Sequence, residues 1–501
     1  MALTPKKIYE DLKKKEIDKL SAADLLIFLI ENADTIDTRL ESIKTLLKID
    51  IKNKKIFSIL ENLLISDSNE EIRTLAANTL NVLFREKALS PLKWALEHEK
   101  SWQFLLTLTS IISEIDNKAA KSILIDKIKK IDNYQFSISL SPFFKSKEIR
   151  SFSITKLVEL INNYVIINYF EELSKEINYQ VENGSVTELN LSFISKNVFG
   201  WKILKNLTRF INILKYLKKL ELRDNRIATF PKSIISLNSL KYLDLSHNII
   251  NRLPEPIGSL KSLEYLYLRY NNLSEIPTSI GSLKFLKILD LKHNKLTTLP
   301  KSISKLTSLE VLDLHGNQFN TFPTSLEGLP SLKKLKLGLN SLKRVPEWIK
   351  NLRSLKKLGL GENKSLSNFQ EWIDFLPSVV ELNLYDNDIK ELPQSIGSLN
   401  SLKVLILPNN QLTSLPESFK NLISLKKLDL SYNDFKELPE WIGSFSSLEE
   451  LNLESNNLKS LPESIGSLSS LKILNLILNK DITKLPESIK YLQNKGLKIL
   501  K

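Results

Sequence analysis

The sequence contains no cysteine among its 501 residues. This absence excludes disulfide bonds, thiolate ligands for zinc, iron–sulfur clusters and a cysteine nucleophile. A chain that folds without oxidation suits a reducing compartment, and we expect this protein in the cytoplasm.

Long hydrophobic runs are also missing. The most compact apolar run near the N-terminus covers residues 25–30, far fewer than the roughly 20 residues that span a bilayer. The sequence therefore predicts neither a signal peptide nor a transmembrane helix. Hydrophobic residues make up 42% and charged residues 26% of the chain, which is ordinary globular usage and argues against a disordered protein.

Signals of catalysis are scarce. No phosphate-binding loop of the form G-x-x-x-x-G-K-[ST] occurs, and the chain has only four histidines. Two Asp–His pairs, Asp290 with His293 and Asp313 with His315, fall on neighbouring predicted strands, within reach of a shared metal ion. Hydrogen bonding or contact with a partner explains the same residues. We predict no metal, no cofactor and no enzymatic activity.

Arginine is rare among the basic residues, although it suits bidentate phosphate binding better than lysine does. The formal net charge is +14, and residues 1–183 carry equal numbers of acidic and basic side chains. The whole excess therefore belongs to residues 184–501. A solvated, lysine-rich surface and an attraction to an acidic partner both account for it.

The second part of the chain contains a repeat of 23 residues. Its pattern, L-x-x-L-x-L-x-x-N-x-L-x-x-L-P-x-x-I-x-x-L, fits residues 286–306 without a mismatch, and such a fixed period indicates a solenoid. We number the repeats from one to twelve. Their asparagines are Asn225, Asn248, Asn271, Asn294, Asn317, Asn340, Asn363, Asn387, Asn410, Asn433, Asn456 and Asn479.

The leucine spacing predicts one short strand in each repeat. Alternating leucines point into the core while the residues between them point to solvent, so successive strands can pair in parallel. The asparagine amide can donate to and accept from buried backbone groups of neighbouring repeats. We therefore predict that the twelve asparagines form a structural ladder. Because a single repeat is unstable alone, stacking has to bury a continuous core.

This pattern resembles the leucine-rich repeat family, specifically the intracellular leucine-proline class of Ras-suppressor-like proteins and polarity scaffolds. The resemblance covers residues 186–501. It implies a leucine-rich repeat horseshoe with a parallel concave sheet over residues 184–501, with a degenerate starter repeat from Val186, twelve repeats and a short C-terminal cap. It also implies a protein–protein interaction scaffold in small-GTPase or phosphatase signalling.

Residues 1–183 carry apolar side chains at helical spacing, near 5–15, 21–32, 35–49, 53–66, 68–84 and 101–115. Three segments share an arginine followed by a small residue and a leucine, and they begin at Arg39, Arg73 and Arg150. This pattern resembles HEAT-type helical repeats, with a generic helical bundle as the alternative. The expected fold is an all-helical, HEAT-like domain followed by the solenoid.

The outward strand positions are candidates for a binding surface. In each nine-residue segment that ends in the asparagine, we expect positions three, five, seven and eight to face the concave side. They hold six of thirteen tyrosines, three of four histidines and no phenylalanine, which favours a wet surface of amphipathic rings. Tyrosine and arginine are typical of interface hot spots. We predict a protein partner, or alternatively a solvated face, at Arg223, Tyr242, Asp244, His247, Tyr265, Tyr267, Arg269, Tyr270, Asp290, His293, Asp313 and His315.

Two further features bear on partner contact. Four glycines, Gly316, Gly338, Gly359 and Gly361, remove side chains from the middle of the concave face, where a partner backbone is expected to approach closely. On the convex side, Trp348 and Trp372 lie two residues beyond the proline position. We expect them either to pack over the convex turns or to form a second contact site.

Charge favours a protein over a nucleic acid. The outward positions carry eight basic and eleven acidic residues, which disfavours nucleic acid in the concavity. The second position of each segment holds lysine in eight repeats, including Lys218, Lys241, Lys287 and Lys333. This basic rim is either a solubility device or a weak binder of anionic membrane or nucleic acid, which is the alternative function.

Overall fold

The computed structural model describes residues 3–196, 198–366, 372–376 and 378–501. The chain divides into two compact units, Met1–Leu189 and Asn190–Lys501. Among the described residues, no helix combines the length and apolar character needed to cross a bilayer.

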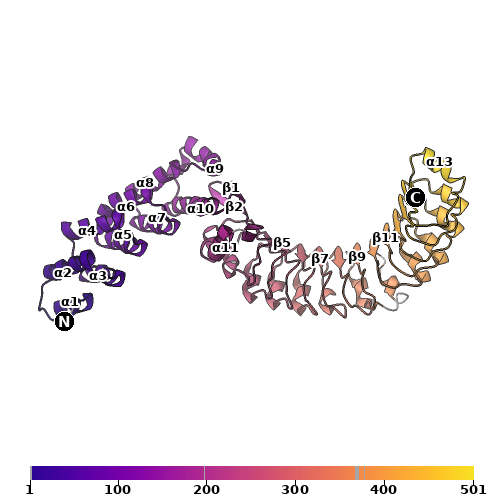
Figure 1. The fold of residues 1–501 in the computed structure, drawn as a ribbon, viewed down its shortest axis with the longest axis horizontal. Coiled ribbons are helices and arrows are strands. Elements are labelled where there is room, and N and C mark those ends of the chain that lie inside the picture. Colours follow the sequence, from indigo (N-terminus) through magenta and orange to yellow (C-terminus); the bar gives the residue numbers. More distant parts are fainter. Residues whose placement is uncertain (1–2, 197, 367–371, 377) are drawn as a thin grey trace. The chain divides into compact units, whose positions relative to one another are not determined.

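Helices that pack against one another in succession build most of the first unit (Figure 1). Several begin at a side chain that accepts a backbone N–H, as Thr4, Asp18, Asn53 and Ser153 do, which satisfies donors that a helix start leaves free. The helices are α1 Pro5–Lys13, α2 Lys19–Asn32, α3 Ile36–Ile49, α4 Lys54–Ser66, α5 Glu70–Phe84, α6 Leu89–His98, α7 Trp102–Ile115, α8 Lys118–Lys129, α9 Tyr134–Lys145 and α10 Ile154–Leu173.

The arginine pattern of this unit holds for two of its three members. Arg39 of α3 pairs with Asp67, which lies between α4 and α5. Arg73 of α5 pairs with Glu99, which lies between α6 and α7, at 3.0 Å. Arg150 instead ends a 3₁₀ turn before α10, outside any α-helix. Arg150 therefore differs in place from Arg39 and Arg73, which both lie within α-helices. The HEAT-like character of the unit stays a prediction.

A strand pair follows the last helix of this unit, which the all-helical expectation missed. Strands β1 Asn178–Glu182 and β2 Ser185–Asn190 are joined by Asn183 and Gly184, with φ of 52° and 72°. An Asn-Gly pair favours this left-handed two-residue turn because glycine lacks a Cβ and asparagine tolerates the conformation. The predicted starter strand at Val186 lies within β2.

One short strand from each repeat builds the sheet of the second unit. The strands pair in parallel and in chain order, and they line the concave side of the unit (Figure 1). Leu243 lies opposite Leu266, one repeat apart. The strands are β3 Lys219–Glu221, β4 Tyr242–Asp244, β5 Tyr265–Tyr267, β6 Ile288–Asp290, β7 Val311–Asp313, β8 Lys334–Lys336, β9 Lys357–Gly359, β10 Glu381–Asn383, β11 Val404–Ile406, β12 Lys427–Asp429, β13 Glu450–Asn452, β14 Ile473–Asn475 and β15 Lys498–Leu500.

The return path of each repeat is a 3₁₀ turn. Proline precedes most of these turns and fixes φ near the value that the turn requires, as Pro300 does with φ −66°. Leucines and isoleucines from strands and turns are fully buried between the two sides. The turns include Lys232–Ser236, Glu255–Ser259, Thr278–Ser282, Lys301–Lys305, Thr324–Leu326, Glu347–Asn351, Ile373–Phe375, Gln394–Ser398, Glu417–Asn421, Glu440–Ser444 and Glu463–Ser467.

Helices flank the array in sequence. Helix α11 Val198–Phe210 precedes the first repeat, and α13 Ile489–Asn494 follows the last 3₁₀ turn. After α13 the chain forms β15, which pairs with β14 and extends the sheet by one strand.

Hydrogen bonds of the asparagine side chains connect adjacent repeats. Asn294 Nδ2 donates to the carbonyl oxygens of Leu291, in its own repeat, and Leu268, in the preceding one, both at 3.0 Å. Its Oδ1 accepts the backbone N–H of Leu273 at 3.0 Å. The side chain is buried, so these bonds satisfy backbone groups that water does not reach.

Candidate functional site

Tyrosine rings from β4 and β5 contact one another on the concave sheet. The ring centroid of Tyr242 lies 5.2 Å from that of Tyr267 and 6.1 Å from that of Tyr265, and all three side chains are half-buried. The Lys219 ammonium lies 5.1 Å from the centre of the Tyr242 ring, a cation–π distance. Burial raises the pKa of the Tyr242 and Tyr267 hydroxyls, so both phenols stay protonated and can donate hydrogen bonds.

A second row of rings crosses the ends of four successive strands. His247 stacks on Tyr270 with ring centroids 4.4 Å apart, Tyr270 lies 4.5 Å from His293, and His293 lies 5.3 Å from His315. We call these four side chains and the three tyrosines the ring cluster. The sequence placed these residues at outward strand positions, but it did not predict that the four rings of this row touch in succession. Their role in binding a partner stays a prediction.

The backbone at position eight is left-handed throughout the array. His247, Tyr270 and His293 have φ between 50° and 55°, and Tyr432 of the tenth repeat has 53°. This conformation costs free energy for a residue with a Cβ, so a single non-glycine residue in it usually marks a constrained site. Here it recurs along the sheet, because the chain turns out of every strand at this position. It is therefore a property of the array.

Neighbouring rings cover three of the four concave glycines, which corrects the expectation of an open floor at those three. A Cβ on Gly316, which has φ of 66°, would lie 2.2 Å from His293 Nδ1, and one on Gly338 would lie 2.7 Å from His315 Nδ1. A Cβ on Gly361 would likewise lie 2.2 Å from a tyrosine ring of the next repeat. These three glycines make room for rings of this chain rather than for a partner's backbone. The fourth, Gly359, has no such ring, and a Cβ there would lie 3.7 Å from the Lys336 side chain, an ordinary contact distance.

Each aspartate at position five is the last residue of its strand. Asp244 and Asp313 are buried, and Asp290 is half-buried. Because the two buried carboxylates are not available to a partner, we correct the predicted set by removing Asp244 and Asp313. The sequence carried an unrecognised sign of this structural role, because Asp or Asn recurs at position five. Seven such side chains accept, through an oxygen and at 2.8–3.1 Å, the backbone N–H of the residue two positions later: Asp244, Asp290, Asp313, Asn383, Asp429, Asn452 and Asn475.

Two arginines border the ring cluster at position seven. The Arg223 guanidinium lies 5.7 Å from the centre of the exposed Phe193 ring, and Arg269 extends from the end of β5. Both cations lower the pKa of His247, after the larger effect of burial. Neither arginine forms an ion pair with the described residues, so both can pair with a partner's carboxylate.

Burial keeps the histidines of the cluster neutral. It lowers the pKa of His315 to about 4, and the Lys292 ammonium adds to the effect. Burial also lowers the pKa of His293 and, again with Lys292, favours its uncharged form. Within the described ranges, no group of three or more His, Asp and Glu side chains is placed to hold a metal ion.

His315 makes stability depend on pH. An unfolded histidine titrates near about pH 6.5, whereas folded His315 titrates near 4, so the unfolded chain binds more protons between these values. Stability therefore falls as the pH falls through this window. We expect His315→Gln to gain about 1–2 kcal/mol relative to the wild type between pH 7 and 4.5, allowing for partial exposure. Urea melts at both pH values test this, with His98→Gln as the control. A pH-independent difference between His315→Gln and the wild type would contradict it.

The convex tryptophans differ from one another. Trp372 is 1% exposed, so its assignment as a contact residue is wrong: the side chain fills the core. Trp348 is half-buried and packs edge-on against Phe322 of the preceding repeat, with ring centroids 6.3 Å apart.

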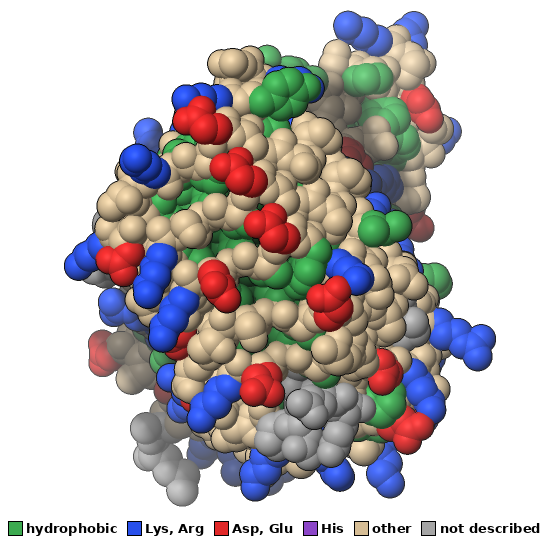
Figure 2. Space-filling model, turned by 90° about the vertical axis from the view of Figure 1, so that its right-hand side faces the viewer, with side chains coloured by type: hydrophobic (Ala, Val, Ile, Leu, Met, Phe, Trp, Pro, Cys, Tyr) green, Lys and Arg blue, Asp and Glu red, His purple; other side chains and the backbone are tan. Residues whose placement is uncertain are grey.

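Ion pairs partly neutralise the lysine rim. Glu264 binds Lys241 at 3.1 Å and Lys287 at 2.7 Å, and these bonds lower its pKa. Glu449 likewise lies between two rim lysines, which lower its pKa to about 2. On the face seen in Figure 2, basic and acidic side chains are interspersed. Such exposed pairs add little stability, but they reduce the positive potential available to an anionic surface.

Models of known protein families match most of the second unit. A family model described as a leucine-rich repeat region matches residues 280–379 and 380–456, and two leucine-rich repeat models match residues 215–273 and 447–468. A comparison with curated proteins gave no match.

Solved structures also resemble the chain. A leucine-rich repeat protein of Leptospira interrogans is 33% identical over 58% of this chain and 86% of that one, with a TM-score of 0.43. An internalin of Listeria monocytogenes is 20% identical over 67% of this chain and 94% of that one, with a TM-score of 0.51, which reflects the fold alone.

Proposed function

Because this chain belongs to the leucine-rich repeat proteins, we propose that it is a non-enzymatic scaffold that binds a protein partner on its concave sheet. The ring cluster is the observation that carries the proposal. Its rings form two contacting groups that together cross four strands, all half-buried except the exposed Tyr270, and Arg223 and Arg269 flank them. Rigid aromatic side chains beside unpaired guanidinium groups are the usual anchors of protein interfaces.

The cluster suits a partner of mixed chemistry. Its phenols donate hydrogen bonds, its histidines are neutral, and its rings offer apolar faces. Arg223 and Arg269 would pair with carboxylates of the partner. A surface of this kind supports binding through shape and hydrogen bonds more than through net charge.

The place of the scaffold in the cell is a further part of the proposal. The repeat pattern resembles that of Ras-suppressor-like proteins, which leads us to place this protein in small-GTPase or phosphatase signalling, in the cytoplasm. This assignment rests on analogy of the repeat.

Binding at different salt concentrations tests the scaffold against the anionic-surface alternative. We expect no association with phosphatidylserine vesicles or duplex DNA at physiological salt, because glutamates pair with rim lysines and contacts with phosphate weaken steeply with salt. Co-sedimentation and fluorescence anisotropy measure it, with Lys218→Glu/Lys241→Glu/Lys287→Glu/Lys333→Glu as the rim variant. Strong association at physiological salt that this variant abolishes would overturn the scaffold in favour of an anionic-surface binder.

A further inference from the structure

A cavity in the first unit lies beside the start of α4 and the end of α5. Its volume is about 560 Å³, within the range of sites that hold a side chain or a small ligand. Its lining comes from these two helices, from the connection before α4 and from the 3₁₀ turn after α5. We call it the helical-unit pocket, and it is lined by Lys52, Asn53, Lys54, Phe57, Leu83, Phe84 and Lys87.

The bottom of the helical-unit pocket is apolar. The rings of Phe57 and Phe84 meet edge-on, with centroids 5.2 Å apart and an interplanar angle of 87°. Leu83 is buried and the two rings are half-buried, so part of each ring faces the cavity. Because the rings stand perpendicular to one another, they form a corner that an inserted apolar side chain can fill.

The mouth of the pocket is basic. Lys52, Lys54 and Lys87 are all exposed, and none of the described residues that line the cavity is acidic. Lys54 and Lys87 form no ion pair with the described residues, and Lys52 reaches the Asp50 carboxylate only at 4.0 Å. Residues 1–183 carry equal numbers of acidic and basic side chains, so the positive excess at this pocket is a local feature.

The carboxylates nearest in sequence and space are engaged elsewhere. Glu86, next to Lys87 in the chain, accepts a hydrogen bond from Asn117 at 3.4 Å, and Asp24 pairs with Lys55 at 2.6 Å. The first turn of α4 contains no acidic residue, and the start of a helix carries partial positive charge. The ammonium groups at the mouth therefore remain available to carboxylates of a partner.

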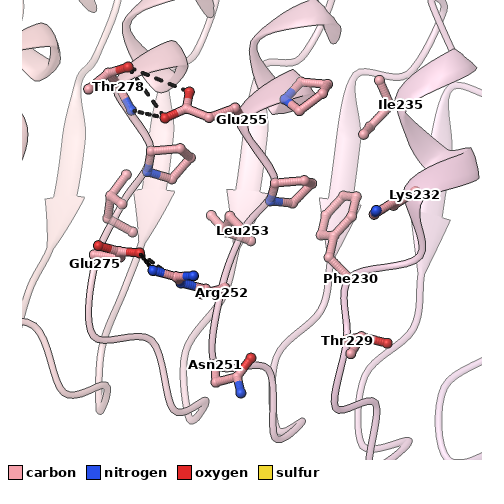
Figure 3. Close-up of a pocket in the computed structure, with 14 residues that line it drawn as sticks. Thr229, Phe230, Lys232, Ile235, Asn251, Arg252, Leu253, Glu255, Glu275 and Thr278 are labelled. Atoms are coloured by element: carbon pink, nitrogen blue, oxygen red, sulfur yellow. Dashed lines mark hydrogen bonds and ion pairs between the residues drawn. The ribbon is translucent and has the colours of Figure 1, made fainter.

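A larger cavity of the second unit shows the contrast (Figure 3). It lies beside the 3₁₀ turns of the first three repeats, has a volume of about 820 Å³ and is lined by two cations and two carboxylates. Arg252 pairs with Glu275 at 2.7 Å, and Glu255 accepts hydrogen bonds from Thr278. Phe230 is buried. That cavity offers neither a net charge nor an accessible ring.

We propose that the helical-unit pocket binds an acidic segment of a protein partner, which inserts one aromatic side chain into the corner between Phe57 and Phe84. Carboxylates beside that side chain pair with Lys54 and Lys87. The inserted ring gains by edge-to-face packing in addition to the area that it buries, whereas exposed ion pairs add little affinity and mainly select the partner. This contact is separate from the concave sheet and goes beyond the binding proposed there.

The pocket favours a peptide over a nucleic acid or a membrane. Rings that meet at 87° share no flat face on which successive bases stack, and the lining contains no arginine, which suits phosphate better than lysine does. Apolar side chains that bind a bilayer project into it, whereas these two rings lie at the bottom of a cavity. A single side chain of a peptide can reach that bottom while its neighbours stay at the mouth.

Binding of acetyl-Glu-Glu-(4-fluoro-Phe)-Glu-Glu-amide to the full chain, followed by fluorine NMR, tests the proposal. We expect Lys54→Glu/Lys87→Glu to weaken binding by about tenfold or more, because carboxylates replace both ammonium groups. Both lysines are exposed, so this variant should fold normally. The matched control is Lys6→Glu/Lys145→Glu, which changes the net charge equally at exposed positions of α1 and α9 and should bind as the wild type does.

Competition tests the apolar part of the site without altering the protein. Unlabelled acetyl-Glu-Glu-Phe-Glu-Glu-amide should displace the probe about tenfold better than acetyl-Glu-Glu-Ser-Glu-Glu-amide, since serine leaves the corner between the rings empty. Tyr267→Ala/Arg269→Ala/Tyr270→Ala should bind the probe normally, which separates this pocket from the concave surface.

Four outcomes would each overturn the proposal. They are equal binding of the probe by Lys54→Glu/Lys87→Glu and the wild type, equal displacement by the serine and phenylalanine peptides, no binding by the wild type, and displacement of the probe by oligothymidylate or phosphatidylserine vesicles more readily than by the phenylalanine peptide. The last outcome would assign the pocket to a nucleic acid or to a membrane.

Discussion

Replacing Tyr267, Arg269 and Tyr270 with alanine should remove about 3–5 kcal/mol from the binding of a concave-face partner. Tyr267 contacts the Tyr242 ring, and Tyr270 lies in the middle of the ring row next to His247. The variant therefore interrupts both parts of the ring cluster and removes one guanidinium group. Affinity measured by calorimetry, for a partner captured with the wild type, checks the result.

Stability separates lost contacts from lost folding in this variant. The three side chains are outward and half-buried or exposed, so their truncation opens no core cavity. We expect the free energy of unfolding to fall by only about 1–2 kcal/mol, from the broken ring contacts. Tyr432→Ala, at an exposed outward position of the tenth repeat, is the control. Unimpaired binding by the triple variant would show that the concave face is not the partner's site.

Replacing Asn294 with alanine should lower the free energy of unfolding by about 1–3 kcal/mol. The substitution leaves the carbonyls of Leu291 and Leu268 and the N–H of Leu273 without the bonds that Asn294 provides. These groups lie inside the array, where water does not replace the lost bonds.

The matched control is Asn320→Ala, the same substitution at an exposed position of the array. It should change the stability by no more than about 0.5 kcal/mol. Denaturant melts of the two variants measure the difference. Equal, small effects would mean that the asparagine bonds are not a source of stability in this fold.

Periodicity alone predicted most of the second unit. Nearly every repeat buries its leucines and its asparagine in the same way, with Asn340 half-buried, so one local pattern, read in phase, gives the strand, the turn and the parallel sheet. The 3.6-residue spacing predicted most early helices of the first unit. It missed the strand pair around Asn183 and the 3₁₀ turn at Arg150, because both depend on a few residues without a period.

The sequence by itself determined which residues face the concavity, since alternation along a strand fixes that choice. Only the tertiary structure decided what those residues do there. Asp244 and Asp313 became buried strand ends, neighbouring rings covered three of the four concave glycines, and Trp372 joined the core. The reason is that burial depends on side chains 23 residues away in the next repeat. The contact between Trp348 and Phe322 arises in the same way.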